Sequence, residues 1–379
     1  MAEVAAKINA TITAGRLTDA EVYWRTLQPW LLESGYQLRE RFQPDWTPSW
    51  LKSKKRAMSS PDGIWLFSGQ LIDAVKLEDD SRVALKKFRK SVHPFEEDIS
   101  KYLSSEPLAS DPRNHCVPIL ETLYPPGDED TVILVMPLLR AYDSPRFDTV
   151  GEVMDCFRQL FEGLQFMHER HVAHRDINAN NFMLDGRNLY PSGYHPLSPK
   201  ETYDLTHVAK HLTRTQLPPK YYIIDFGISR RYKPEDCPPL EPPIEGGDRT
   251  VPEFQTSDEP RDPFPTDVYY AGNFIRQQFL EGHPLLASVR GREGFEFMRP
   301  LINDMVQDDP SKRPTMNEVL QRFEEITSSL SAVRLRSRVV PRTDSALKGF
   351  LLTFPHWWRK ASYIIRRLPA VPSAPRPVV

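Results

Sequence analysis

Alternating apolar and polar positions mark the first half of the chain as rich in β-strands. Residues 70–75 (QLIDAV) and 82–88 (RVALKKF) read as two strands, and the polar segment 77–81 between them suits a hairpin turn. A continuous apolar run at 131–136 (TVILVM) predicts a buried strand. Residues 94–103 predict a short helix with a proline in its first turn.

The hydrophobic period changes to that of a helix from about residue 150. Apolar residues recur three or four positions apart over 153–167 and form one face of a predicted helix. Further helices are predicted near 266–281, 297–307 and 315–328. A small β-rich region followed by a larger helical region predicts an α+β fold.

Both ends of the chain differ from this body. Residues 1–55 form an aromatic-rich extension that is too apolar for a free tail, so we expect it to pack on the body. After Ala332 the sequence has ten Lys or Arg residues and a single acid, Asp344. We expect this basic tail, 331–379, either to dock on the body, to be disordered, or to make a peripheral membrane contact.

Charge and cysteine content narrow the class of protein. The 379 residues carry 49 basic and 51 acidic side chains, a balance that argues against a nucleic-acid partner. The three cysteines match neither a zinc pattern nor a disulfide framework, so we expect a reducing, intracellular and cytoplasmic location. The sequence shows neither a secretory leader nor an apolar run of membrane-spanning length, so we expect neither feature.

The strongest chemical signal is the segment 174–181, which reads HRDINANN. It resembles the catalytic loop of the eukaryotic protein kinase superfamily, H-R-D-L-x-x-x-N. The resemblance implies that Asp176 orients the substrate hydroxyl and that Asn181 binds a metal ion.

Two further motifs fit the same family. The apolar strand 221–224 is followed directly by Asp225 in the triplet DFG, which resembles the magnesium-binding motif. Residues 83–86, VALK, resemble the motif that presents a lysine to the ATP phosphates, here Lys86. Its carboxylate partner is expected to be Glu96 on the next helix, with Glu97 as the rival.

The resemblance also implies a nucleotide site. We expect ATP to contact Lys86, Glu96 and Asp225 together with Gly69, Leu71, Ala84, Met136 and Leu139. The family's glycine loop departs from its pattern, since its three glycine positions fall at Ile64, Leu66 and Gly69. The substitutions predict either a weaker phosphate cradle or a loop of another shape.

Three later segments resemble further motifs of the family, in the family's order along the chain. Residues 251–253 (VPE) resemble the end of the activation segment, and Asp267 resembles the residue that supports the catalytic loop. Arg313 is expected to pair with Glu253. The resemblance therefore implies a bilobal kinase-like fold.

The expected domain boundaries follow from this order. They are an N-terminal extension (1–55), a small β-rich N-lobe (56–139), a helical C-lobe (140–330) with an insertion at about 187–220, and a basic tail (331–379). In the insertion, His207 and His211 are four residues apart, but surface histidines are favoured over a metal site.

The catalytic and activation segments leave alternatives open. Asn178 and Asn180 stand where the family usually has a lysine or an arginine, so slower phosphoryl transfer is expected. Arg175 indicates control through the activation segment, either by phosphorylation or by acids supplied by the chain. The candidate phosphorylation sites are Ser229, Thr250 and Thr256, and the candidate acids lie in 234–239 or at Glu241.

We therefore expect an active protein kinase that uses ATP and Mg²⁺ on a protein hydroxyl, with serine or threonine as the acceptor. The aromatic extension and the glycine-poor loop resemble divergent protein-kinase-like proteins of fungi. A pseudokinase that binds nucleotide or acts as a scaffold is the alternative, and a kinase of small molecules is a third.

Overall fold

The computed structural model describes residues 9–53, 55–66, 68–244, 247–255 and 257–373. The chain divides into two compact units. The strand unit consists of residues 1–97, 118–140 and 190–211, and the helical unit consists of residues 98–117, 141–189 and 212–379.

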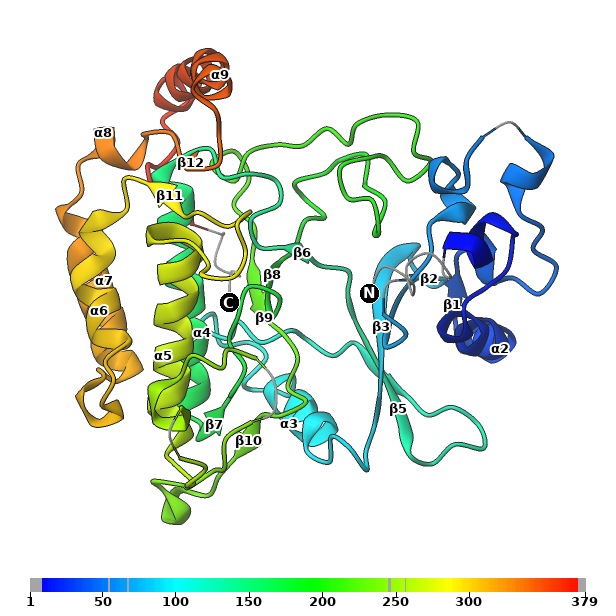
Figure 1. The fold of residues 1–379 in the computed structure, drawn as a ribbon, viewed down its shortest axis with the longest axis horizontal. Coiled ribbons are helices and arrows are strands. Elements are labelled where there is room, and N and C mark those ends of the chain that lie inside the picture. The colour runs from blue at the N-terminus through cyan, green and yellow to red at the C-terminus, as the bar shows by residue number, and fades with distance from the viewer. Residues whose placement is uncertain (1–8, 54, 67, 245–246, 256, 374–379) are drawn as a thin grey trace. The chain divides into compact units, whose positions relative to one another are not determined.

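The strand unit is built on one antiparallel sheet in the order β1-β2-β3-β5-β4 (Figure 1). Its strands are β1 (Tyr36–Leu38), β2 (Leu71–Lys76), β3 (Ser81–Arg89), β4 (Glu121–Leu123) and β5 (Thr131–Pro137). The predicted strands at 70–75, 82–88 and 131–136 are confirmed as β2, β3 and β5. Sequence periodicity missed β1 and β4 because three residues are too few to show alternation.

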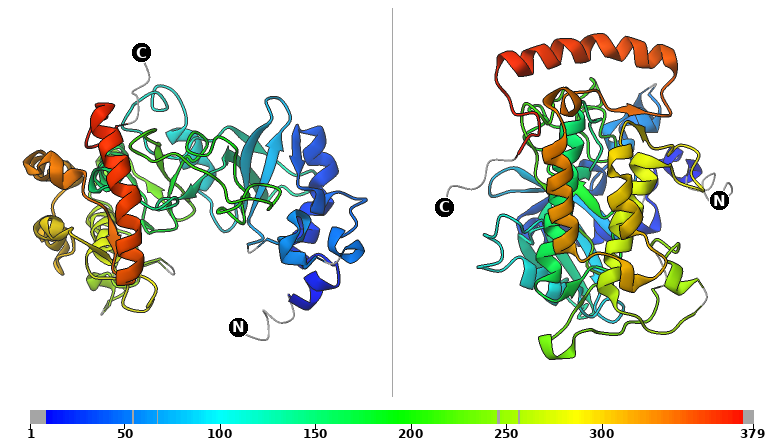
Figure 2. Two further views of the ribbon diagram at one scale, coloured as in Figure 1. Left: turned by 90° about the horizontal axis from the view of Figure 1, so that it is seen from above. Right: turned by 90° about the vertical axis from the view of Figure 1, so that its left-hand side faces the viewer.

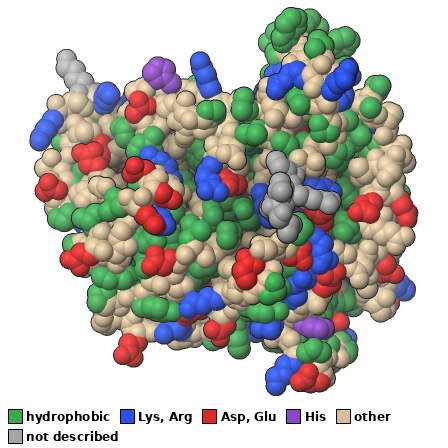
Figure 3. Space-filling model, turned by 180° about the vertical axis from the view of Figure 1, so that it is seen from behind, with side chains coloured by type: hydrophobic (Ala, Val, Ile, Leu, Met, Phe, Trp, Pro, Cys, Tyr) green, Lys and Arg blue, Asp and Glu red, His purple; other side chains and the backbone are tan. Residues whose placement is uncertain are grey.

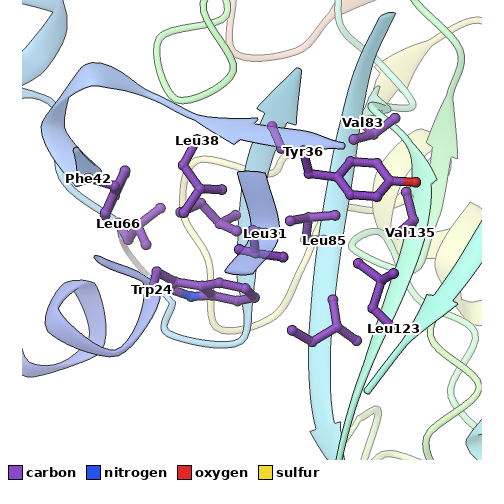
Figure 4. Packing of buried hydrophobic residues seen from close by; sticks show 13 residues of the cluster. Trp24, Leu31, Tyr36, Leu38, Phe42, Leu66, Val83, Leu85, Leu123 and Val135 are labelled. Atoms are coloured by element: carbon purple, nitrogen blue, oxygen red, sulfur yellow. The ribbon is translucent and has the colours of Figure 1, made fainter. Parts of the chain in front are cut away.

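The N-terminal extension packs on this sheet, as predicted. Its helix α2 (Asp19–Glu33) begins at Thr18, whose side chain forms a capping box with Glu21. Trp24 and Leu31 of α2 are fully buried and share a hydrophobic core with residues from every strand of the sheet (Figure 4). Short 3₁₀ turns follow at Glu40–Phe42, Ser49–Lys52, Ala57–Ser59 and Pro61–Gly63.

A buried ion pair anchors the extension. The guanidinium of Arg41 binds both carboxylate oxygens of Glu21, at 2.7 and 3.0 Å, and neither side chain is exposed to solvent. Arg41 also lies over the ring of Trp46 and donates to the backbone oxygen of Asp62 at 3.1 Å. Burial raises the pKa of Glu21, but the hydrogen bond and charge of Arg41 outweigh it, so the pKa is lowered and the carboxylate stays ionised.

The insertion departs from its expected place. Residues 190–211 belong to the strand unit, whereas the sequence predicted the whole of 187–220 as part of the helical region. The guanidinium of Arg82, from β3, lies 3.8 Å from the ring centre of Tyr203, which in turn stacks on His195. Burial lowers the pKa of His195 to about 4, so its imidazole is neutral at pH 7.

Non-local cation–π contacts explain why the sequence could not place the insertion. Arg140 lies over both Tyr190 and Tyr194, at 4.1 Å from each ring centre.

His207 and His211 do not share a helix, and both are exposed. Among the described residues, no cluster of three or more His, Cys, Asp or Glu side chains is arranged to hold a metal ion.

The helical unit surrounds the long helix α4 (Val150–His168), which begins at Thr149 (Figure 1). Its other helices are α5 (Pro263–Ile275), extended by a π-turn at Arg276–Leu280, α6 (Arg299–Met305), α7 (Met316–Ser329), α8 (Ala332–Leu335) and α9 (Ala346–Ile365). The predicted helices at 153–167, 266–281, 297–307 and 315–328 correspond to α4, α5, α6 and α7. Helix α3 (Glu96–Leu103) begins in the strand unit and continues in the helical unit.

Short strands shape the loops of the helical unit. β7 (Val172–Ala173) pairs with β10 (Arg230–Arg231), β8 (Phe182–Leu184) with β9 (Tyr221–Ile223), and β11 (Arg292–Glu293) with β12 (Val340–Pro341). A two-residue strand, β6 (Arg140–Ala141), extends the β8–β9 sheet. Among the described residues, no helix is both long and apolar enough to cross a membrane.

Replacing Glu21 by glutamine tests the anchoring pair. Glu21→Gln leaves the Arg41 charge buried without a counter-charge, so we expect a loss of about 3–5 kcal/mol in the free energy of unfolding. Urea unfolding measures it. The matched control is Glu281→Gln, which breaks the exposed pair with Arg299 and should cost less than about 1 kcal/mol. Equal effects of the two substitutions would contradict an anchoring role for Glu21.

Candidate active site

The strand unit presents Lys86 from the centre of its sheet. Lys86 lies on β3 and pairs with the Oε1 atom of Glu96, in the first turn of α3. Glu96 is almost fully buried, whereas Glu97 accepts a hydrogen bond from the hydroxyl of Tyr124 at 2.5 Å. The geometry therefore selects Glu96 over Glu97 as the partner of Lys86.

The remaining predicted nucleotide contacts of the strand unit lie near Lys86 in the sheet. Leu71 is the cross-strand neighbour of Lys86 and is about half exposed. Ala84 pairs with Met136 across β3 and β5, and both side chains are buried. Leu139 lies just after β5 and is half-buried. The strand pairing thus places Leu71, Ala84 and Met136 near Lys86 in the sheet, and the roles of these residues and of Leu139 toward ATP stay predictions.

The glycine-poor loop has a structural explanation. Ile64 and Leu66, which stand at two of the three glycine positions, are almost fully buried. The backbone oxygen of Ile64 accepts a hydrogen bond from Arg39 at 3.0 Å, and the backbone nitrogen of Leu66 donates to Glu21 at 3.3 Å. These two residues are therefore fastened to the N-terminal extension.

Gly69 is held by the same extension. Its backbone oxygen accepts a hydrogen bond from the indole of Trp24 at 3.0 Å. A side chain at position 69 would come within 2.9 Å of Ala20, so glycine is needed here for close approach of α2. Sequence reasoning missed the roles of Trp24 and Glu21; the apolar residues at 64 and 66 were the available signal.

In the helical unit, two side-chain amides orient the carboxylate of Asp176 in the catalytic loop. The carboxylate of Asp176 accepts hydrogen bonds from Asn178 at 2.9 Å and from Asn181 at 2.7 Å. Asn178, at the family's lysine position, thus donates to Asp176 itself. Burial raises the pKa of Asp176, and the negative charge of Asp225 raises it further, against the lowering effects of His174 and the two amides.

The fully buried carboxylate of Asp267 holds the backbone of the catalytic loop in place. Asp267 of α5 accepts the backbone N–H groups of His174 and Arg175, both at 2.7 Å, and contacts His168 at 3.1 Å. Arg175 has a φ of 70°, a strained value for a residue with a side chain. The supporting role predicted for Asp267 is confirmed by these contacts.

The DFG segment is fastened to the catalytic loop. Asp225 follows β9, and the backbone N–H of the preceding residue, Ile224, donates to the backbone oxygen of Asn181 at 2.9 Å. His174 contacts the backbone oxygen of Ile224 at 3.0 Å. Asp225 itself has a φ of 70°. The structure thus brings Asp176, Asn181 and Asp225 together in one unit.

This donor set fits a magnesium ion bound with a nucleotide. Mg²⁺ prefers oxygen ligands and is commonly held by one or two carboxylates together with substrate phosphates. The amide nitrogen of Asn181 is committed to Asp176, so its amide oxygen is the atom that can face a cation. Asp225 supplies the carboxylate beside it.

The activation segment is held by an acid. The guanidinium of Arg175 binds Glu241 at 3.2 Å and donates to the backbone oxygens of Ile228 and Pro242. The hydroxyl of Tyr232 also donates to Glu241, at 3.1 Å. Of the alternatives that the sequence left open around Arg175, the geometry favours the acid Glu241.

The predicted phosphorylation sites differ in their surroundings. Ser229 is fully buried, and its hydroxyl donates to the backbone oxygen of His174 at 2.9 Å. Thr250 is exposed but bonds to the carboxylate of Asp248 at 2.7 Å, and a phosphate there would meet a like charge. Thr256 lies outside the described residues.

The end of the activation segment is fixed by a second ion pair. Arg313 binds both carboxylate oxygens of Glu253, at 2.8 and 2.6 Å, and both side chains are buried. The predicted pairing of these two residues is confirmed. Nearer the catalytic loop, Gly247 lies against Asp176, where any side chain would strike the carboxylate.

Comparison with known proteins agrees with this geometry. The family model described as "Protein kinase domain" matches residues 67–242. Three curated relatives match short segments. The nitrogen permease reactivator protein of Saccharomyces cerevisiae is 27% identical over 121 residues, which are 31% of this chain and 15% of that protein. The serine/threonine-protein kinase CAK1 of the same yeast is 31% identical over 97 residues, which are 26% of this chain and 19% of that kinase.

The third relative is a probable serine/threonine-protein kinase, an MRK1 homolog, of Encephalitozoon cuniculi. It is 37% identical over 38 residues, which are 10% of this chain and 12% of the relative. The chain thus covers less than a fifth of the length of each curated relative described here.

Restoring a glycine at position 66 tests the fastened loop. Leu66→Gly removes a buried side chain from the core, so we expect a loss of about 2–5 kcal/mol in the free energy of unfolding and no gain in ATP affinity. Urea unfolding and calorimetric titration with ATP measure both quantities. The control is Leu77→Gly, the same change at an exposed site in the same unit. Tighter ATP binding at unchanged stability would show that residue 66 covers the phosphates.

Proposed function

Because the chain is a divergent member of the protein kinase superfamily, we propose that it transfers the γ-phosphate of ATP to a hydroxyl group of a protein. The observation that carries the proposal is the group formed by Asp176, Asn181 and Asp225, in which two amides orient one acid beside a second. In this proposal the strand and helical units are the two lobes of a bilobal kinase fold.

Each residue then has a chemical task. Asp176, oriented by Asn178 and Asn181, accepts a hydrogen bond from the substrate hydroxyl and positions it for attack on phosphorus. Asn181 and Asp225 would hold Mg²⁺, which, when bound, neutralises charge that develops on the phosphates. Lys86, held by Glu96, supplies a fixed positive charge for the phosphates.

Serine or threonine is the proposed acceptor. Two of the matched relatives are named serine/threonine-protein kinases, one of them as probable, which supports this choice over tyrosine. The match is short in both cases, so the protein substrate is proposed only as a class.

A pseudokinase is the second candidate, and two observations favour it. The loop at Ile64 and Leu66 is fastened to the N-terminal extension, and Asn178 brings no positive charge to the catalytic loop. Both features remove charge or backbone donors that stabilise the transferring phosphoryl group. A scaffold that binds nucleotide without useful turnover would keep the Lys86–Glu96 pair and the catalytic loop.

Phosphoryl transfer from radiolabelled ATP separates the two functions. We expect Asp176→Asn to lower the transfer rate at least about 100-fold, because the substrate hydroxyl loses its carboxylate acceptor. Asp225→Asn should abolish transfer and also the magnesium-dependent part of the thermal stabilisation by ATP, which Asp176→Asn should retain. Asp45→Asn, at an exposed site, is the matched control.

The same experiment can contradict the enzyme. Thermal stabilisation by ATP, with neither autophosphorylation nor phosphoryl transfer to generic protein substrates, would identify a pseudokinase. Equal transfer by the wild type and by both active-site variants would show that the activity comes from a contaminant.

Within the proposed kinase, Glu241 replaces the activating phosphate. Its carboxylate occupies the position beside Arg175 and lies 4.0 Å from Arg230, and its backbone forms a bridge with Arg261. An acid built into the chain can order the activation segment without phosphorylation, because it supplies the negative charge that Arg175 needs.

Glu241→Gln tests this assignment. We expect the transfer rate to fall about tenfold, because Arg175 loses its counter-charge and the activation segment is less ordered. Glu259→Gln, an exposed acid of the same segment, should leave the rate unchanged. If phosphatase treatment abolishes wild-type activity while Glu241→Gln leaves it intact, a phosphate and not Glu241 orders the segment.

A further inference from the structure

The tail helix α9 is docked on the helical unit through a cluster of contacts around the buried carboxylate of Asp148. Asp148 accepts hydrogen bonds from Arg359, at 2.7 and 2.9 Å, and from the hydroxyl of Tyr363 at 2.9 Å, and it contacts His356 at 3.1 Å. The Tyr363 hydroxyl also bonds to Thr213 at 2.8 Å. Figure 2 shows α9 lying crosswise over one end of the helical unit.

These contacts fix the rotation of α9 about its own axis. His356, Arg359 and Tyr363 are three and four residues apart, so at about 3.6 residues per turn they lie on one face. His356 and Tyr363 are almost fully buried. Burial raises the pKa of Asp148, but hydrogen bonds from His356 and Arg359 outweigh it, so the pKa is lowered and the anchor stays charged.

The polarity of α9 is the reverse of an ordinary surface helix. Such a helix buries its apolar face and exposes its polar face, whereas α9 buries polar side chains and exposes apolar ones. Its exposed large side chains are Leu347, Phe350, Leu351, Phe354, Trp357, Trp358, Ile364 and Ile365. Trp357 and Trp358 are 71% and 82% exposed. An apolar face of this extent marks a binding surface.

Charge identifies what covers this face. By helical spacing, Lys360 lies along one margin of the apolar face, whereas Lys348 and Arg359, along the other margin, are paired with Asp344 and Asp148. Arg366 and Arg367 follow the helix and are exposed, and the sequence contains no acid after Asp344. In Figure 3 the projection formed by α9, at the upper right, carries hydrophobic side chains at its tip and Lys or Arg side chains beneath.

We propose that α9 is an interfacial helix that binds the surface of an anionic lipid bilayer. Tryptophan and phenylalanine insert at the boundary between headgroups and acyl chains, while flanking Lys and Arg contact anionic headgroups. The helix lies in the plane of the interface and does not span the bilayer. An association between two copies through this face is disfavoured, because it would bring basic margins together with no acid on α9 to pair with them.

Vesicle co-sedimentation of the full chain tests the proposal. We expect the protein to bind vesicles of equal parts phosphatidylcholine and phosphatidylserine and to bind phosphatidylcholine alone much more weakly. Trp357→Ala/Trp358→Ala should weaken partitioning onto the anionic vesicles about 100-fold, at about tenfold for each buried aromatic side chain. Arg366→Gln/Arg367→Gln should weaken it about 30-fold on the anionic vesicles.

A matched control distinguishes vesicle binding by α9 from non-specific binding through other exposed apolar side chains. Leu285 and Leu286 are an exposed apolar pair elsewhere in the helical unit, and Leu285→Ala/Leu286→Ala should leave partitioning unchanged. Circular dichroism checks that each variant is folded.

Three results would overturn the proposal. The first is failure of the wild-type protein to bind anionic vesicles. The second is equal binding by the wild type and the tryptophan variant. The third is a concentration-dependent dimer, seen by light scattering, that the tryptophan variant abolishes while vesicle binding is absent; this would assign the face to a second copy of the chain.

Discussion

The free-energy cost of burying an ionised carboxylate is the constraint on which this structure depends most. A buried acid must be given hydrogen-bond donors or a counter-charge, and the groups that supply them are then held in place. Glu21 fixes the N-terminal extension through Arg41. Asp267 fixes the backbone of the catalytic loop, and Asp148 fixes the tail helix. Three regions that are remote in sequence are thus positioned by one kind of interaction.

The same constraint connects the extension to the candidate nucleotide site. Glu21 accepts from the backbone of Leu66 as well as from Arg41, and Trp24 of the same helix donates to Gly69. The segment that resembles the family's glycine loop therefore contributes Leu66 to the hydrophobic core of the strand unit. The apolar side chains at positions 64 and 66 follow from that packing, because burying an apolar side chain stabilises the fold and glycine has none to bury.

The proposed phosphoryl transfer depends on a more local balance of charges around Asp176. Asn178 and Asn181 orient the carboxylate of Asp176, while burial and the charge of Asp225 oppose its ionisation. A bound cation would relieve that opposition, because it places positive charge beside both acids. Glu241 plays the complementary role in the activation segment, where it gives Arg175 a permanent counter-charge.

Local sequence patterns were enough to predict the strands β2, β3 and β5, the main helices, and the motif residues around Asp176, since periodicity and short motifs involve neighbours in the chain. They left open the choice between Glu96 and Glu97, the state of the loop at Leu66 and the place of the 190–211 insertion. The folded arrangement was needed to resolve these three points, because each depends on partners far away in the chain. The orientation of α9 is the clearest case: its sequence is amphipathic, but the buried carboxylate of Asp148 determines which face points outward.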